Sequence, residues 1–136
     1  MTTRRLTFAK LSTFAALALI ITLPNAASAD TGADLLAGYR AETGKPFSAT
    51  NGEHLFRARH GEMSCTSCHT DNAKAAGKHV KTGKLIEPLA PVANPQRLSD
   101  PAKVEKWFKR NCNDVLKRTC TAQEKGDFVT YLRSIK

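Results

Sequence analysis

Methionine is scarce in this chain of 136 residues, because only Met1 and Met63 are present. Few positions can therefore offer a thioether sulfur as a ligand. The chain also lacks an apolar run long enough to span a bilayer comfortably, since Leu11 to Leu23 is too short. No basic stripe with stacking aromatics is present, which argues against nucleic-acid binding. Internal repeats and low-complexity tracts are absent too, so we expect one small domain.

The first part of the chain has the features of a cleaved signal peptide. Arg4, Arg5 and Lys10 make the start positive, the apolar run follows, and Ala27-Ser28-Ala29 is a small-residue cleavage site. The alternative, an uncleaved membrane anchor, is disfavoured by so clear a cleavage site. We expect a signal peptide over residues 1–29 and a mature domain over residues 30–136, exported to the periplasm.

The segment Cys65-Thr66-Ser67-Cys68-His69 is the most informative part of the chain. Cys-x-x-Cys-His is the attachment motif of a c-type haem, in which both thiols form thioether bonds and the adjacent imidazole becomes the proximal iron ligand. We therefore expect one covalent haem c, held by Cys65, Cys68 and His69. The alternative is a zinc site built from these residues or from the pair Cys112 and Cys120. Export and the spacing of the second pair argue against zinc.

The shortage of methionine bears on the opposite face of the iron. An ordinary electron-carrying cytochrome c places a methionine sulfur there. Met1 would be lost with the leader, and Met63 lies only two residues before Cys65, too close to reach that face. The distal ligand is therefore a histidine, a weaker group or none. A weak or open distal site favours a haem that binds small molecules as well as electrons.

Several residues are candidates for the distal position: three histidines (His54, His60 and His79), several lysines, and Asn111. His54 and His60 precede the motif, at positions expected on the proximal side or the rim. His79 follows the motif and is the histidine alternative. Asn111 interrupts an apolar helical stripe, where burying an amide is costly unless it finds a partner. The spacing is equally compatible with a haem-facing amide and with a core asparagine bonded to backbone.

Helical patterns dominate the mature domain, and the expected fold is all-α, with three to five helices around one haem. The spacing predicts a helix over Asp30 to Glu42 and a second one starting near Asn51. Glycines and prolines mark Asn72 to Asp100 as mostly loop around the haem edge. Asp100-Pro101 begins a third helix, and the capping box Thr121 to Glu124 begins the last. The third helix has one expected apolar face, made of Val104, Trp107, Phe108, Asn111 and Val115.

Two further cysteines, Cys112 and Cys120, lie eight residues apart. In an oxidising compartment we expect them to form a disulfide that closes this short loop. Such a bond would fix the end of the helix and hold the side chain of Asn111 in one place.

The mature domain is basic. Subtracting the three basic residues of the leader from the 21 Lys and Arg of the chain leaves 18, against 12 Asp and Glu, so the net charge is +6. This charge favours attraction to an acidic redox partner. A basic surface that is merely solvated is an equally good interpretation.

Several segments resemble the sphaeroides haem protein family. The most specific is Val104 to Val115, which contains Arg-Asn-Cys-Asn and is followed by Cys120-Thr121 and Glu124-Lys125. The resemblance covers nearly all of the mature chain, because three further segments also match: Leu35-x-x-Gly38-Tyr39, the haem motif, and Thr82-Gly83-Lys84 with Pro88-Leu89-Ala90-Pro91.

The resemblance implies a role for Asn111, which stands immediately before the first disulfide cysteine. In the family this asparagine is the sixth iron ligand in the ferric state. The resemblance also implies a Cys112–Cys120 disulfide and a variant of the class I cytochrome c fold. The related cytochrome c double-prime group has a histidine at this place, so this sequence departs from that group. It departs from ordinary class I proteins in the long interval between Phe56 and Cys65.

The chemistry of an amide ligand is consistent with a redox-gated site. An amide oxygen is hard and weak, so it suits Fe(III) better than Fe(II), and reduction is expected to release Asn111. Ferrous haem could then bind O2, NO or CO, with the amide nearby as a hydrogen-bond donor. The resemblance further implies oxygen binding, a proposed nitric oxide dioxygenase activity, and a dihaem cytochrome c as electron donor.

Two other functions remain open from the sequence. A plain periplasmic electron carrier with no gas substrate would show no ligand uptake. A haem-based sensor is disfavoured because a single domain lacks an output module. We expect a monomer that receives electrons from a dihaem cytochrome c or from a membrane cytochrome b.

Overall fold

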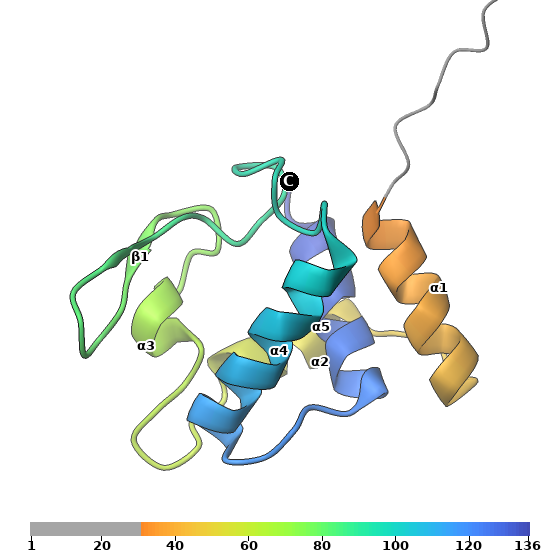
Figure 1. Cartoon of the computed structure of the whole chain (residues 1–136), viewed down its shortest axis with the longest axis horizontal. Coiled ribbons are helices and arrows are strands. Elements are labelled where there is room, and N and C mark those ends of the chain that lie inside the picture. The colour runs from red at the N-terminus through yellow and green to blue at the C-terminus, as the bar shows by residue number, and fades with distance from the viewer. Residues whose placement is uncertain (1–30) are drawn as a thin grey trace, which may run out of the picture.

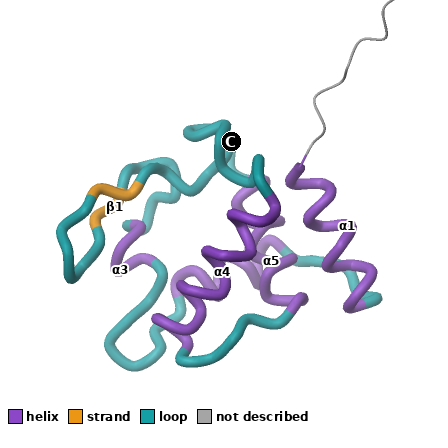
Figure 2. The backbone as a smooth tube through the Cα atoms, viewed as in Figure 1, coloured by secondary structure: helices purple, strands orange, loops and turns teal. Residues whose placement is uncertain are grey.

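The computed structural model describes residues 31–136, so the expected signal peptide over residues 1–29 lies outside the described residues. The helices are α1 (Thr31–Thr43), α2 (Ala49–Arg57), α3 (Thr66–His69), α4 (Pro101–Leu116) and α5 (Ala122–Ser134). Strands β1 (Gly77–Lys78) and β2 (Leu85–Ile86) pair antiparallel as a small hairpin. Figure 2 shows that long loops join these elements. The predicted all-α class is confirmed, whereas the hairpin within Asn72 to Asp100 was not predicted.

Short local motifs determine where the helices begin. The side chain of Ser48 caps α2, which begins at Ala49, slightly before the predicted start. Asp100 caps α4, with Pro101 in its first turn, and Thr121 and Glu124 form the capping box of α5. These side chains satisfy backbone N–H groups that have no partner within a helix. The predicted starts of α4 and α5 are therefore confirmed.

Helix α5 is the centre of the packing, because both α1 and α2 lie against it. One buried cluster joins α2 to α5 and includes Phe56, Tyr131 and Leu132. A second joins α1 to α5 and α4 and includes Leu35 and Val129, with Phe108 packed against it. Phe128 links the two clusters, since its ring centroid lies 6.1 Å from that of Phe56 and 5.8 Å from that of Phe108.

The remaining elements lie to one side of this helical core. Figure 1 shows α3 and the hairpin on the side of α4 that is opposite to α1. The loop after the hairpin is held by Arg97, which donates to the carbonyl oxygens of Pro88 (2.7 Å) and Glu87 (2.6 Å). Within residues 31–136 we find no helix long and apolar enough to cross a membrane.

Candidate haem site

Helix α3 presents the three residues of the haem motif. Cys65 occupies its N-cap position, and Cys68 and His69 belong to its single turn. The amide of His69 donates to the carbonyl oxygen of Cys65 over 3.1 Å, which closes the turn. Neither Cys65 nor Cys68 takes part in a disulfide, so both sulfurs are available for thioether bonds. One short element therefore holds two sulfurs and an imidazole at fixed positions, as covalent haem attachment requires.

The residues around the motif hold this turn in place. The buried Ser64 is bonded through both its amide and its side chain: the amide donates to Oγ of Ser67 over 3.0 Å, and the hydroxyl lies 2.7 Å from that of Thr66. On the other side, β1 lies directly against the motif. A Cβ atom added to Gly77 would lie 2.0 Å from the carbonyl oxygen of Cys68, so only glycine fits there.

Burial shifts the pKa values of two residues of the motif. Burial, with a smaller contribution from the positive charge of Arg97, lowers the pKa of His69 to about 4. The imidazole is therefore neutral at pH 7 and keeps a lone pair for iron. Burial also raises the pKa of Cys65 to about 11, so this thiol is protonated at neutral pH.

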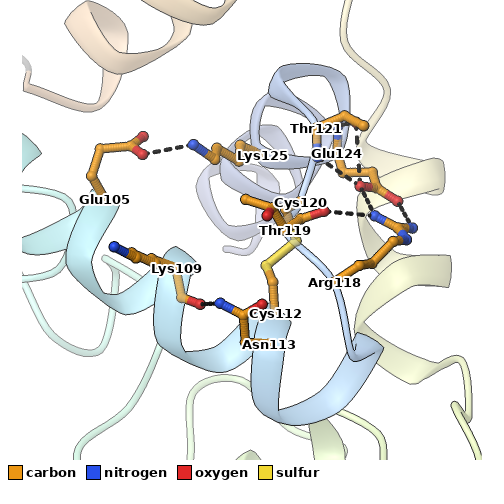
Figure 3. The surroundings of a disulfide bond; sticks show 10 residues. All are labelled: Glu105, Lys109, Cys112, Asn113, Arg118, Thr119, Cys120, Thr121, Glu124 and Lys125. Atoms are coloured by element: carbon orange, nitrogen blue, oxygen red, sulfur yellow. Dashed lines mark hydrogen bonds and ion pairs between the residues drawn. A yellow bond between two sulfur atoms is a disulfide. The ribbon is translucent and has the colours of Figure 1, made fainter.

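The second pair of cysteines forms a disulfide. Cys112 and Cys120 are bonded, with their Cα atoms 5.7 Å apart, and Figure 3 shows that the bond ties the last part of α4 to the segment before α5. The structure thus contains the disulfide that the sequence suggested. The pair is not available for the zinc alternative, and no group of three or more His, Cys, Asp or Glu side chains within residues 31–136 could hold a metal ion.

Helix α4 has two different flanks, although the sequence predicted a single apolar face. Val104 and Phe108 pack against the second cluster, and Val115 is buried. Trp107 is 40% exposed, and Asn111, one turn further along, is also exposed. The difference arises because α5 and α1 cover only one side of α4. The other flank therefore exposes an indole and an amide.

Asn111 has no side-chain hydrogen bond among the described residues, whereas its neighbour Asn113 donates to the carbonyl oxygen of Lys109 over 2.6 Å. The structure therefore does not show the core asparagine bonded to backbone that the spacing also allowed. The unbonded amide stands immediately before the disulfide residue Cys112.

The three histidines considered as distal ligands lie in different places. His54 is exposed on α2, and His60 pairs with Met63, its amide donating to the Met63 carbonyl over 2.7 Å. The Nδ1 atom of His79 accepts from the amides of Lys81 and Thr82, each over 3.3 Å. His79 therefore stabilises the turn of the hairpin.

Two residues that shape the site, Gly77 and Arg97, were not among the predicted site residues. Both act through contacts between segments that are separated in the chain, which no local spacing reveals. The only sequence signal was weak, namely a glycine in the loop after the motif. Two cysteines outside any disulfide, a neutral imidazole and the uncovered flank of α4 fit a covalently attached haem.

Known proteins resemble this chain over most of its length. A family described as a domain of unknown function (DUF1924) matches residues 42–132. The cytochrome c-type protein SHP of Cereibacter sphaeroides is 42% identical over 124 residues, which are 88% of this chain and 95% of that protein. Cytochrome c'' of Methylophilus methylotrophus is 48% identical over 71 residues, 52% of this chain and 49% of that protein.

Two solved structures are also similar to this chain. Oxidized SHP, described as an oxygen-binding cytochrome c, superposes with a TM-score of 0.71 at 45% identity, covering 74% of this chain and 94% of its own. Oxidized cytochrome c'' from Methylophilus methylotrophus superposes with a TM-score of 0.68 at 34% identity, covering 78% and 95%. These likenesses confirm the predicted class I-like, all-α cytochrome fold. The chain therefore belongs to the sphaeroides haem protein (SHP) family of c-type cytochromes, which carry covalently bound haem c.

Proposed function

We propose that this protein is a periplasmic cytochrome with one haem, which Cys65, Cys68 and His69 hold and for which Asn111 is a distal ligand released on reduction. The haem, when bound, supplies one-electron chemistry and a coordination position for a diatomic gas such as O2, NO or CO. Electrons come from a dihaem cytochrome c or a membrane cytochrome b. An oxidoreductase activity of the nitric oxide dioxygenase type is consistent with this arrangement.

The observation that carries the proposal is the state of Asn111. Its amide is exposed and unbonded among the described residues, on the flank of α4 that also exposes Trp107. A side chain in this state needs no other bond to break before it binds or leaves the iron. The solved structure of SHP, a relative described as oxygen-binding, adds support.

The backbone of Asn111 is held while its side chain is free. Cys112 is bonded to Cys120, and the six residues between Glu105 and the disulfide are all helical. Glu105 itself is tied to α5 by an ion pair with Lys125, at 2.6 Å. The amide can therefore move by side-chain rotation, without a shift of α4.

The chemistry of the amide gives the proposed gating its direction. A neutral, hard oxygen ligand binds Fe(III) better than Fe(II), so reduction weakens the hold of Asn111 on the iron. The released side chain keeps its NH2 group close to the position it left. That group can donate a hydrogen bond to a gas molecule bound there.

The environment of His79 favours Asn111 as the distal ligand. Nδ1 of His79 is already the acceptor for two backbone amides in the hairpin turn. The hairpin also packs through Gly77 on α3, and α3 is the helix that contains the proximal His69. Ligation by His79 would have to disrupt this turn, whereas ligation by Asn111 disrupts nothing.

The test compares Asn111→Ala with Asn113→Ala in the haem-loaded protein. Asn113 is a matched control, because it is an exposed asparagine on the same helix whose amide bonds to backbone. We expect Asn111→Ala to change the ferric absorption spectrum and the ferrous affinity for CO, and Asn113→Ala to change neither. The wild-type ferrous spectrum should shift promptly when CO is added.

Two results would contradict the proposal. One is an Asn111→Ala variant with an unchanged ferric spectrum and unchanged CO affinity. The other is a low-spin ferrous spectrum that does not respond to CO, which would assign a strong distal ligand such as His79 and make the protein an electron carrier without a gas substrate.

A further inference from the structure

The hairpin formed by β1 and β2 exposes apolar side chains that the fold does not require at the surface. Val80 is 52% exposed and Leu85 is 65% exposed. Leu85 pairs with Lys78 across the two strands, so their side chains lie on the same side of the ladder. The partner pair, Gly77 and Ile86, faces the protein instead. The outward side of this hairpin therefore combines a bare aliphatic group with a cation.

The same hairpin carries three lysines. Lys78, Lys81 and Lys84 are all exposed, and none of them forms an ion pair with another residue in the described part of the chain. No acidic residue occurs between Asp71 and Glu87. We call the group formed by Lys78, Val80, Lys81, Lys84 and Leu85 the hairpin surface. It combines two exposed aliphatic side chains with three lysines of the same hairpin.

The hairpin surface is ordered in advance. The amide of His79 donates to the carbonyl of Lys84 over 2.9 Å, and that of Gly83 donates to the carbonyl of His79 over 2.8 Å. The imidazole of His79 accepts two more amides of the turn. A partner therefore meets a preformed surface, and binding does not bear the entropic cost of ordering a loop.

The base of the hairpin touches the haem motif. Gly77 packs so closely on the carbonyl of Cys68 that no side chain fits between them. Cys68 is one of the two proposed attachment residues. A protein docked on the hairpin surface would therefore stand one short strand away from a covalent link to the haem, which is where an electron donor needs to be.

We propose that the hairpin surface is the docking site for an acidic electron-transfer protein, which gives one electron to the ferric iron and is itself oxidised by one electron. This inference rests on the proposed function, since it identifies where the electron enters. An apolar centre with a charged rim is the usual anatomy of a protein interface. Complementary charge raises the association rate by about 10- to 1000-fold at low ionic strength.

The experiment measures reduction of the haem-loaded protein by flavodoxin, used as an acidic one-electron donor, in stopped flow at several salt concentrations. We expect the triple variant Lys78→Glu, Lys81→Glu, Lys84→Glu to lower the second-order rate about tenfold or more at low salt, with little salt dependence left. Reduction by photoreduced lumiflavin, a small neutral flavin, should be unchanged. This comparison separates docking from any change in the haem.

A matched control has the same net charge as the hairpin variant. The triple variant Lys45→Glu, Lys103→Glu, Lys136→Glu makes the same change in total charge at exposed positions outside the hairpin. We expect it to lower the rate by less than about threefold. Equal losses in the two triple variants would overturn the proposal, because net charge alone would then explain the attraction.

Two further measurements do not depend on turnover. In NMR titrations of the oxidised protein with oxidised flavodoxin, amide shifts should be confined to residues 77–86 and their neighbours. Val80→Ser with Leu85→Ser should weaken binding while leaving the salt dependence intact. Shifts elsewhere would contradict the docking site. Sedimentation with anionic vesicles that is lost in the lysine variant would instead assign the surface to a membrane.

These outcomes can be told apart from failure of the proposed gating. If Asn111→Ala leaves the spectra and CO affinity unchanged, gating by Asn111 is wrong, yet the effect of the hairpin variants on flavodoxin still stands. If the hairpin variants behave like the matched control while Asn111→Ala changes CO binding, only the docking site is wrong.

Discussion

Asn111 and Asn113 are neighbouring amides on α4 in opposite situations. Asn113 is bonded to the helix backbone, and Asn111 has no side-chain bond among the described residues. A surface helix can satisfy an asparagine locally, because the carbonyl of residue i−4 is within reach. That Asn111 does not use this option leaves its amide available for a ligand outside the chain.

Replacing this amide by an imidazole should abolish the proposed release of the distal ligand on reduction. An imidazole binds both ferric and ferrous iron, unlike an amide oxygen, so Asn111→His is expected to keep its ligand after reduction. The ferrous absorption spectrum should become low-spin, and CO uptake should be slower than in the wild type. Prompt CO uptake by this variant would mean that residue 111 does not reach the iron.

Residues at the site differ in how far the sequence reveals them. Cys65, Cys68 and His69 are identified by a contiguous motif, because covalent attachment and ligation need those types in that order. The prediction for Asn111 depends on family resemblance, since an asparagine in an apolar stripe can either face the haem or bond to the backbone in the core. Gly77 and Arg97 were missed because their importance arises from contacts made only in the folded chain.

At the scale of single elements, the capping box of α5 makes stability depend on pH. A hydrogen bond from Arg118 and bonds from Thr121 lower the pKa of Glu124 to about 2, although its partial burial opposes the shift. The ordinary pKa is 4.5, so the folded state binds this proton less tightly than the unfolded state. The stabilisation is therefore complete above pH 4.5 and is lost as the pH falls towards 2.

Glu124→Gln tests this contribution. Glutamine preserves the capping box but not the ion pair with Arg118, whose Nη2 lies 2.6 Å from Oε1 of Glu124. After discounting for solvent screening, we expect a loss of about 1 kcal/mol in the free energy of unfolding at pH 7. Urea denaturation at pH 7 and pH 3 measures it, and the variant should lose less stability than the wild type on acidification. An identical pH dependence in both proteins would contradict the assignment.

The hairpin depends on a glycine at its base. Gly77→Ala would push a methyl group into the carbonyl of Cys68, so we expect a loss of about 1–3 kcal/mol of stability and less complete haem attachment. Gly38→Ala in α1 is the control, since nothing lies within 4 Å of the new atom. It should stabilise by about 0.5–1 kcal/mol. Denaturation midpoints and the haem-to-protein absorbance ratio measure the two effects.

Elements with local signals were the easiest to predict. The starts of α4 and α5 follow from capping side chains within four residues of each other, so the sequence alone locates them. The hairpin has only two residues in each strand, and its support comes from α3 and from the side chain of His79. The two flanks of α4 were not predicted because periodicity does not say how wide a face the neighbouring helices cover.

At the scale of the whole molecule, the disulfide joins the last part of α4 to the segment that leads into α5. We expect Cys112→Ser with Cys120→Ser to lower the free energy of unfolding by about 2–3 kcal/mol, because the unfolded chain regains the freedom of a short loop. Guanidinium denaturation of the haem-loaded protein measures this loss. The wild type under reducing conditions should show the same loss, and an unchanged midpoint in both would contradict a structural role for the bond.

A second connection holds α4 from the other end. The hydroxyl of Tyr39 donates to Glu105, and Lys125 pairs with the same carboxylate, so α1, α4 and α5 meet at one partly buried point. Burial raises the pKa of Tyr39, and the carboxylate of Glu105 raises it further, so the phenol remains a donor at neutral pH. The Tyr39→Phe variant removes only this donor, and we expect it to cost about 1 kcal/mol, measured by thermal unfolding.

Held at Glu105 and at Cys112, the backbone of residue 111 has little freedom to leave. Under the proposed function, the displaced amide is therefore a tethered competitor, whose effective concentration at the iron is set by one side-chain rotation and not by diffusion. An external gas must outcompete this internal ligand at every encounter. The affinity for gases is then determined as much by the rigidity of α4 as by the chemistry of the iron, and loosening either end should lower the competitor's concentration and tighten gas binding.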